Sequence, residues 1–340
     1  MSRLKVAEYC NLRRKRDSLH FRAVLSQPYG PRQRRRGAPY PLFMMYTFRR
    51  LALPPLGLLL AAVAVLLANE WAVACASHRI ADVPYVAASA PDFDAKRHRL
   101  DIYQPRQEAA PRPVVLFIHG GSWNSGSKDD ILYKTIGRRL AKQGFVGVVI
   151  SYRLAPQVLV PQQADDCARA LAWTVAHIQE YGGDPRRIVL MGHSAGGGLA
   201  ALLATGSDTL LARHGLPPRA AHAVLLDDPA GLDMLDYLTK MEYEGDAQYL
   251  VPFSKDPAVW RQASALYHMR AGAPPFSLYI GGDTYPSIKG SSEKFRQRMK
   301  QLGQEPKYVV EPGEKHIPMV LQLFWSSNVL YKELHRLAGG

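Results

Sequence analysis

The sequence predicts an α/β fold in which a mostly parallel sheet is covered by helices on both faces. From about residue 97 of the 340-residue chain, short apolar and β-branched runs alternate with longer segments of helical periodicity. The runs are nearly continuously apolar, as expected for strands that are buried on both faces. A sheet of this kind carries its functional loops at the carboxyl ends of its strands.

Six segments have the strand pattern and five have the helix pattern. Strands are expected at residues 114–118, 145–152, 188–191, 223–226, 276–280 and 307–311. Helices are expected at residues 132–142, 164–178, 199–205, 291–302 and 321–337. Asp165 and Asp166 are expected to open the second helix, because carboxylates favour the positive end of the helix dipole.

The positive charge of the chain is concentrated at its amino terminus. The chain has 43 Lys and Arg against 29 Asp and Glu, a formal net charge of +14. Residues 1–50 contribute +11 of this charge and residues 51–340 only +3. Residues 1–50 have no sustained apolar period, so we expect a disordered basic leader. The nearly neutral remainder argues against a nucleic-acid partner.

Residues 44–76 have the parts of a secretory signal peptide. Two arginines precede the uncharged apolar stretch 56–68, and small residues follow at 72–76. This stretch suits a signal peptide and is shorter than the roughly 20 residues of a comfortable membrane span. We therefore expect an exported protein, periplasmic or secreted, with a start at Met44 or Met45 or an unusual leader, and one domain over residues 77–340. An uncleaved signal anchor or a lipid on Cys75 are open alternatives that would attach the protein to a membrane.

A glycine-rich pentapeptide follows the strand expected at 188–191. It consists of Gly192-His193-Ser194-Ala195-Gly196 and leads into an apolar helix. A strand, a tight turn around a serine and a helix form a nucleophile elbow, in which small neighbours let a strained backbone expose the hydroxyl. The side chain of His193 is expected to point away from the catalytic base and to have a structural role.

A serine nucleophile needs a base, an acid that orients the base, and donors for the oxyanion. The ends of other strands offer them in His119-Gly120-Gly121-Ser122-Trp123, Gly281-Gly282-Asp283 and Gly313-Glu314-Lys315-His316. The order Ser194, Asp283, His316 is the order that this kind of fold requires. Asp227 and Asp228, after the strand at 223–226, are alternative acids, although the acid is expected after the next strand.

These ordered motifs resemble the α/β-hydrolase family, specifically the branch with an H-G-G-x-W motif that includes bacterial carboxylesterases, feruloyl-esterase-like proteins and kynurenine formamidases. The similarity covers about residues 97–337. The resemblance implies Ser194 as nucleophile, His316 as general base and acid, and Asp283 as the orienting acid. It also implies that Gly120, Gly121 and Ala195 donate to the oxyanion.

The substrate is expected to be a small or medium carboxylic ester, bound beneath a small cap. Trp123, beside the oxyanion loop, is expected to contact it. Aromatic residues between positions 228 and 274 either line an acyl or aryl pocket or pack the cap; they are Tyr237, Tyr243, Tyr249, Phe253, Trp260 and Tyr267.

The expected activity is that of a carboxylesterase working through an acyl-enzyme on Ser194. An arylformamidase-type amide hydrolase and a non-catalytic binding protein on the same scaffold are the alternatives. We expect no cofactor, and no metal because no His, Cys and Asp cluster has ligand spacing. The sequence leaves the oligomeric state open.

Overall fold

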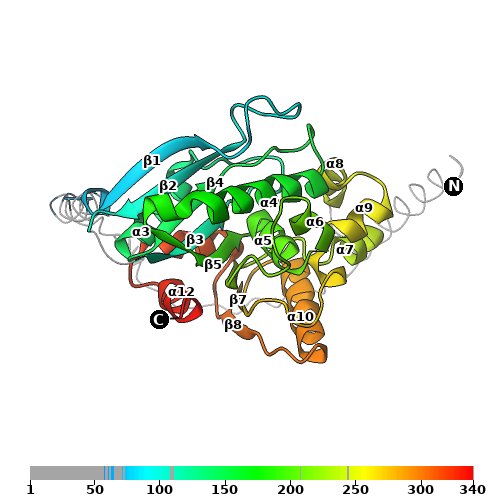
Figure 1. Cartoon of the computed structure of the whole chain (residues 1–340). Helices are drawn as coiled ribbons and strands as arrows, with labels where there is room; N and C mark the ends of the chain where they lie inside the picture. The colour runs from blue at the N-terminus through cyan, green and yellow to red at the C-terminus, as the bar shows by residue number, and fades with distance from the viewer. Residues whose placement is uncertain are drawn as a thin grey trace, which may run out of the picture. The chain divides into compact units, whose positions relative to one another are not determined.

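An eight-stranded sheet runs through the computed structural model, in the order β1-β2-β4-β3-β5-β6-β7-β8 (Figure 1). The strand β1 is antiparallel to β2, and β2 is antiparallel to β4, whereas all other neighbours are parallel. The six predicted strands are all present, which confirms the mostly parallel sheet. The strands are Ser77–Pro84 (β1), Arg99–Pro105 (β2), Arg112–Ile118 (β3), Val146–Ile150 (β4), Gly183–His193 (β5), Ala223–Asp227 (β6), Phe276–Gly281 (β7) and Lys307–Glu311 (β8).

The structure describes residues 73–107, 111–206, 208–242 and 245–339, with five further positions between residues 57 and 71. The chain divides into two units, Met1–Pro55 and Leu56–Gly340. The first unit, with the predicted leader, lies outside the described residues, as does most of the predicted signal segment 44–76. Among the described helices, none combines the length and the apolar character that crossing a bilayer requires.

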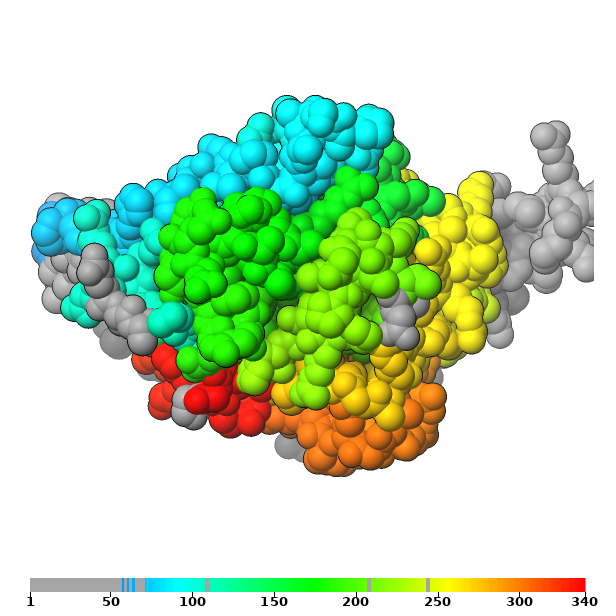
Figure 2. All heavy atoms as spheres, in the orientation of Figure 1, coloured from blue at the N-terminus to red at the C-terminus, as the bar shows by residue number. Residues whose placement is uncertain are grey.

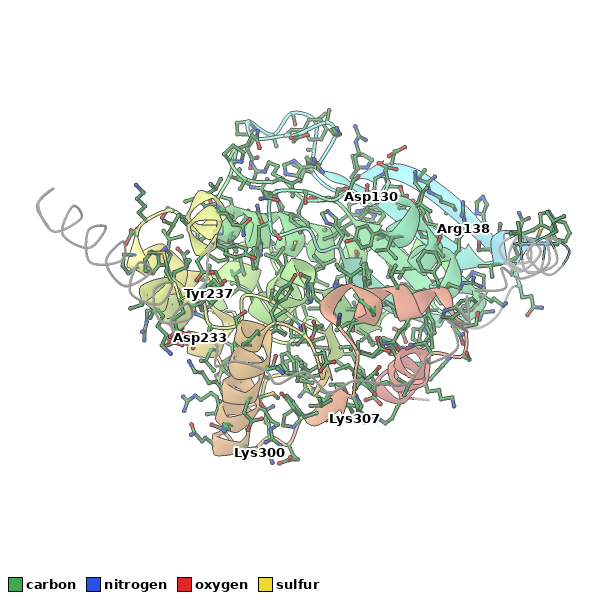
Figure 3. The ribbon with its side chains drawn as sticks, turned by 180° about the vertical axis from the view of Figure 1, so that it is seen from behind. Asp130, Arg138, Asp233, Tyr237, Lys300 and Lys307 are labelled. Atoms are coloured by element: carbon green, nitrogen blue, oxygen red, sulfur yellow. The ribbon has the colours of Figure 1, made fainter. Side chains whose placement is uncertain are left out.

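Helices pack on both faces of the sheet because alternate side chains of each buried strand point to opposite faces. Along β3, Val114 and Leu116 belong to the core beneath α4, α5 and α10. Val115 and Phe117 belong to the core beneath α3, α11 and α12. Figure 2 shows the α4 face, and Figure 3 shows the opposite face. These helices are Val160–His177 (α4), Ala195–Thr205 (α5), Pro286–Gln301 (α10), Ile131–Lys142 (α3), His316–Leu321 (α11) and Val329–Leu337 (α12).

The segment between β6 and β7 forms a small cap, yellow in Figure 1. It consists of short helices: Met234–Lys240 (α7), Asp246–Tyr249 (η2), Leu250–Phe253 (α8), Pro257–Gln262 (α9) and Ala265–Tyr267 (η3). The other short helices are Ile178–Tyr181 (η1), Asp208–Ala212 (α6) and Gln322–Phe324 (η4).

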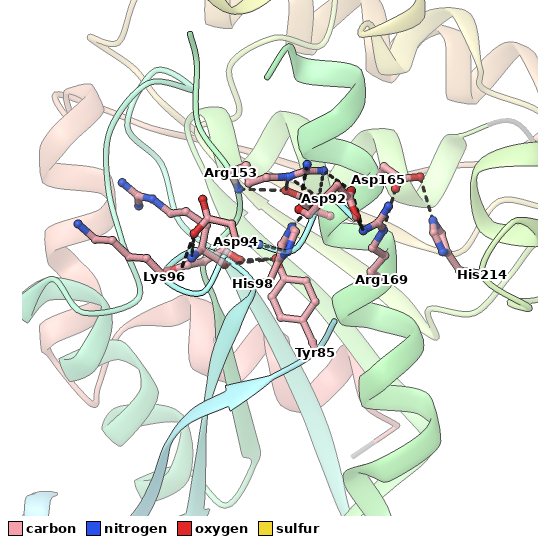
Figure 4. A network of polar contacts seen from close by, with 12 residues as sticks. Tyr85, Asp92, Asp94, Lys96, His98, Arg153, Asp165, Arg169 and His214 are labelled. Carbon is pink, nitrogen blue, oxygen red and sulfur yellow. Dashed lines mark hydrogen bonds and ion pairs between the residues drawn. The ribbon is translucent and has the colours of Figure 1, made fainter. Parts of the chain in front are cut away.

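The helix α4 begins at Val160, so the prediction that Asp165 and Asp166 open it is wrong. A proline in the first turn starts the helix earlier, because its missing N–H and fixed φ suit that position. Asp166 instead pairs with Arg153 at 2.6 Å, and Asp165 pairs with Arg169 at 3.0 Å (Figure 4). The pair of Asp166 and Arg153 fastens the segment after β4 to α4. Arg169 also pairs with Asp92 at 2.9 Å and so fastens the segment before β2 to the same helix.

The helix predicted at 321–337 is interrupted in the structure. The helix α11 already begins at His316, and α12 begins only at Val329. The side chain of Asn328 accepts a hydrogen bond from the Leu330 N–H at 2.8 Å and caps the new helix.

Candidate active site

Ser194 lies on the turn between β5 and α5, with φ of 55°. Glycines surround it because the backbone passes too close for side chains. A Cβ atom on Gly196 would lie 2.1 Å from the carbonyl oxygen of Ile118, and one on Gly192 would lie 2.3 Å from that of Gly196. The spacing of glycines around Ser194 is therefore a packing requirement of the elbow, and it leaves Ser194 partly exposed.

His316 connects the serine to a carboxylate. Its Nε2 lies 2.8 Å from Ser194 Oγ, and its Nδ1 lies 2.6 Å from Asp228 Oδ2. Because a carboxylate accepts the Nδ1 proton, Nε2 is left as a base that accepts from the Ser194 hydroxyl. The arrangement can activate the hydroxyl as a nucleophile. The predicted contact between Ser194 and His316 is present.

The prediction that Asp283 orients His316 is wrong, because Asp228 occupies that position. Asp228 is fully buried, whereas the Asp283 side chain is exposed and its backbone N–H donates to Glu314 at 2.9 Å. Asp228 follows β6 directly, and its φ of 45° turns it toward the histidine. The Gly281 N–H, 3.0 Å from Oδ1, and the Thr284 hydroxyl both donate to its carboxylate. Residues at the end of β7 therefore donate hydrogen bonds to Asp228, whereas the sequence predicts that this end supplies the acid itself.

The loop after β3 presents backbone N–H groups beside Ser194. In the described part of the chain, those of Gly121, Ser122 and Ala195 have no hydrogen-bond acceptor. The Gly120 N–H instead donates to the Tyr133 hydroxyl at 3.2 Å, so the prediction that Gly120 serves as an oxyanion donor is wrong for the free protein. Tyr133 lies in α3, outside the motif at residues 119–123, so this hydrogen bond could not be predicted from the motif. Sequence reasoning missed the Ser122 N–H, for which the glycine pattern gave no signal.

His119 holds the oxyanion loop in place. Its Nδ1–H donates to the Gly120 carbonyl at 2.7 Å, and its ring stacks on Tyr152 with 4.4 Å between centroids. Burial lowers the pKa of His119 to about 4, against the opposing effect of the hydrogen bond to Gly120. The imidazole of His119 is therefore neutral at pH 7 and adds no positive charge beside Ser194.

A cavity of about 640 Å³ opens beside Ser194. Leu132, Ile317 and Val320 give it an apolar wall near α3 and α11. Asp233 and Tyr237 add polar groups to the lining, and Figure 3 shows them near each other beside α10. The cavity therefore combines apolar surface with a few polar groups, as small-molecule sites do.

Trp123 borders this cavity but is only 3% exposed. Its ring meets Phe253 edge-on at 4.8 Å and Tyr249 at 6.1 Å between centroids. The tryptophan thus joins the oxyanion loop to the cap and offers little surface to a substrate.

The aromatic residues of the cap divide between the two predicted roles. Tyr237 and Tyr249 line the cavity, whereas Phe253 and Trp260 are buried in the core. Tyr267 is partly exposed and donates to Asp233 at 2.9 Å, and Tyr243 lies outside the described residues.

In the part of the chain that the structure describes, no three His, Cys, Asp or Glu side chains form a group that could hold a metal ion.

Comparison with known proteins connects these features to esterases. The family model BD-FAE matches residues 100–298. The chain is 32% identical over 256 residues to a probable isoprenylcysteine alpha-carbonyl methylesterase of Arabidopsis thaliana, covering 70% of this chain and 52% of that protein. It is 28% identical over 239 residues to an esterase of Mycobacterium tuberculosis, covering 64% and 56%. The chain thus spans about half the length of the curated relatives it matches.

Solved structures share the fold. Esterase B from Lactobacillus Rhamnosis superposes with a TM-score of 0.64 at 23% identity, over 84% of this chain and 95% of that one. A truncated carbohydrate esterase from gut microbiota superposes with a TM-score of 0.63 at 18% identity, over 77% and 97%. Both likenesses establish the α/β-hydrolase fold.

Proposed function

The chain belongs to the BD-FAE family of α/β-hydrolases, and from this premise we propose that it is a serine esterase that cleaves carboxylic esters. The observation that carries the proposal is the continuous contact from Ser194 through His316 to Asp228, with distances of 2.8 and 2.6 Å. Relatives of the chain are named a probable methylesterase, an esterase and a probable carboxylic ester hydrolase, and these names support the same bond type.

Acylation begins when His316 Nε2 takes the proton of Ser194 Oγ as the oxygen attacks the ester carbonyl carbon. The carbonyl oxygen becomes an oxyanion that the N–H groups of Gly121, Ser122 and Ala195 stabilise. The intermediate then expels the alcohol, which receives the proton from His316 and leaves an acyl group on Ser194.

Deacylation repeats these steps with water as the nucleophile. His316 takes a proton from water, the hydroxide attacks the acyl carbon, and the proton returns to Ser194 as the carboxylic acid leaves. The carboxylate of Asp228 stabilises the imidazolium that forms on His316 in each step. Its buried carboxylate is suited to this role because the Gly281 N–H and the Thr284 hydroxyl hold it in place.

Replacement of the nucleophile tests the proposal. We expect Ser194→Ala to lower kcat for p-nitrophenyl acetate on the order of 10⁶-fold, as loss of the nucleophile does in subtilisin. The variant is also expected to lose covalent labelling by a phosphonate ester, which mass spectrometry of the intact protein detects. Ester hydrolysis equal to that of the parent would contradict the proposal. Faster turnover of N-formylkynurenine than of any ester would assign the same residues to an amide hydrolase.

The substrate class follows from the cavity. Its volume of about 640 Å³ lies within the range of roughly 300–1,000 Å³ typical of small-molecule sites. We expect p-nitrophenyl esters of short and medium acyl chains to react faster than the palmitate, measured as kcat/KM across a chain-length series. The highest kcat/KM for the palmitate would contradict a small-ester enzyme.

Export is part of the same proposal. The concentration of positive charge in residues 1–50 and the small residues after the apolar stretch support cleavage near residue 76. Amino-terminal sequencing of the protein from the extracytoplasmic fraction is expected to begin near that position. A chain that still begins at Met1 would indicate an anchor, and a lipid mass on Cys75 would indicate a lipoprotein.

A further inference from the structure

A second histidine and aspartate pair lies against the first. His193 and Asp227 are neighbours in the parallel register of β5 and β6, and His193 Nδ1 lies 3.0 Å from Asp227 Oδ2. Their side chains are 3% and 0% exposed. The prediction that the side chain of His193 points away from the catalytic base is wrong. The centroid of its ring lies 4.7 Å from the centroid of the His316 ring.

The ends of the two strands explain how both pairs reach one place. Successive side chains of a strand point to opposite faces. Ser194 and Asp228, which follow β5 and β6, have φ angles of 55° and 45° and interrupt this alternation. Each strand therefore contributes two consecutive residues to the site, Ser194 with its neighbour His193, and Asp228 with its neighbour Asp227.

The His193 ring supplies a fixed contact for the catalytic imidazole. Hydrogen bonds hold the two nitrogens of His316, but a small tilt of the ring about the line through these nitrogens changes the two bonds little. Ring contacts restrict that tilt. Tyr285 makes one of them at 5.2 Å, but it is 58% exposed, whereas His193 is buried and bonded to Asp227.

The oxyanion loop passes close to His193. A Cβ atom on Gly120 would lie 3.1 Å from the His193 carbonyl oxygen and 3.6 Å from its Cδ2. Residue 120 therefore has little room for a side chain beside His193.

Two polar atoms of the His193 and Asp227 pair lack hydrogen-bond partners. Among the described residues, His193 Nε2 and Asp227 Oδ1 are buried without hydrogen-bond partners. Unpaired buried polar atoms are unfavourable, so two apolar residues would pack here at less cost to the folded state.

The titratable groups around the two rings are Asp227 beside His193, and Asp228 and Tyr285 beside His316.

We propose that His193, anchored by Asp227, is a positioning residue that fixes the plane of the His316 imidazole during proton transfer. The proposal rests on the proposed esterase function. Misorientation of the base slows the chemical steps without weakening the binding of the ester.

His193→Gln tests the proposal, because glutamine keeps an N–H donor for Asp227 but has no ring. We expect kcat for p-nitrophenyl acetate to fall about 10- to 100-fold, the range of a lost orienting contact, with KM within about twofold. The rate at which a phosphonate ester labels Ser194 is expected to fall in the same proportion.

His98→Gln is the matched control. His98 (Figure 4) is also a buried histidine paired with a buried aspartate, since its Nε2 lies 3.1 Å from Asp166 Oδ1. It does not line the cavity beside Ser194. We expect this variant to lose thermal stability and to keep the parent kcat. A fall in kcat of equal size in both variants would show a general effect of stability and would overturn the proposal.

Asp227→Asn tests the anchor of the His193 ring, because an amide oxygen accepts a hydrogen bond more weakly than a carboxylate. We expect kcat to fall with KM within about twofold, as in His193→Gln. The acid limb of the kcat/KM profile is also expected to move to lower pH, because a negative charge near the imidazolium of His316 is removed. Parent values of kcat and an unmoved profile in both His193→Gln and Asp227→Asn, with an inactive Ser194→Ala, would overturn this inference and leave the esterase proposal standing. An active Ser194→Ala would overturn both.

Discussion

The conformation of Ser194 depends on glycines that no other residue can replace. Side chains at Gly192 and Gly196 would overlap backbone atoms, and the strained φ of Ser194 persists because these contacts fix it. The reactivity of the serine therefore originates in packing between β3, β5 and α5 as much as in its neighbours in the sequence.

Gly196→Ala is expected to abolish ester hydrolysis and lower the melting temperature, because its methyl group would lie 2.1 Å from a backbone oxygen. Thermal unfolding and p-nitrophenyl acetate turnover measure both effects. Gly290→Ala in α10 is the control. A Cβ there has no neighbour within 4 Å, so we expect it to stabilise the fold by roughly 0.5–1 kcal/mol. Parent activity and stability in Gly196→Ala would contradict this account of the elbow.

Some site residues could be predicted from the sequence, and others required the structure. Ser194 and His316 stand in motifs that follow predicted strands, and they contact each other as expected. The sequence offers Asp228 as an alternative acid but favours Asp283. The choice between them depends on a positive φ at Asp228 and on hydrogen bonds from the end of β7, which the order of residues does not encode.

At the scale of elements, the parallel strands were predictable and the antiparallel strands β1 and β2 were not. The parallel strands other than β8 are largely buried on both faces and therefore have nearly continuous apolar runs, whereas β8 lies at the edge of the sheet and is partly exposed. The strands β1 and β2 contain charged residues that the structure pairs across the edge, such as Arg79 with Asp101 at 2.6 Å. Their patterns resemble loops when these partners are unknown.

The helix α12 is attached to the sheet through one buried carboxylate. Glu333 accepts hydrogen bonds from Ser277 of β7 at 2.6 Å, from Arg336 at 2.5 Å and from Lys307 of β8. Burial alone raises the pKa of Glu333, but these hydrogen bonds outweigh it and lower the pKa to about 2. The folded state therefore favours the ionised carboxylate.

This pKa predicts a loss of stability in acid. The contribution of Glu333 is complete above its ordinary pKa of 4.5 and is lost as the pH falls toward 2, because the unfolded chain then binds the proton more readily. Glu333→Gln is expected to lower the free energy of unfolding at pH 7 by up to roughly 3 kcal/mol and to flatten its dependence on pH between 4.5 and 2. Denaturant unfolding at several pH values measures this. An unchanged dependence on pH would contradict the role of the carboxylate.

At the scale of the whole molecule, the sheet order brings the site together. Ser194, Asp228 and His316 follow β5, β6 and β8, which are parallel and end at the same edge. The sequence could predict this edge as the place of the chemistry, because ligands bind at the carboxyl ends of parallel strands. It could not predict the width of the cavity, which depends on how the cap packs against Trp123.

The central claim is that Asp228, and not Asp283, completes the catalytic group. The most direct test compares kcat of Asp228→Asn and Asp283→Asn with p-nitrophenyl acetate at pH 7. Asp228→Asn is expected to lower kcat by about 10⁴-fold, as the corresponding change does in a serine protease, because the amide favours the wrong tautomer of His316. Asp283→Asn is expected to stay within about twofold of the parent, the range of a surface change away from the reacting groups. An inactive Asp283→Asn beside an active Asp228→Asn would contradict the account.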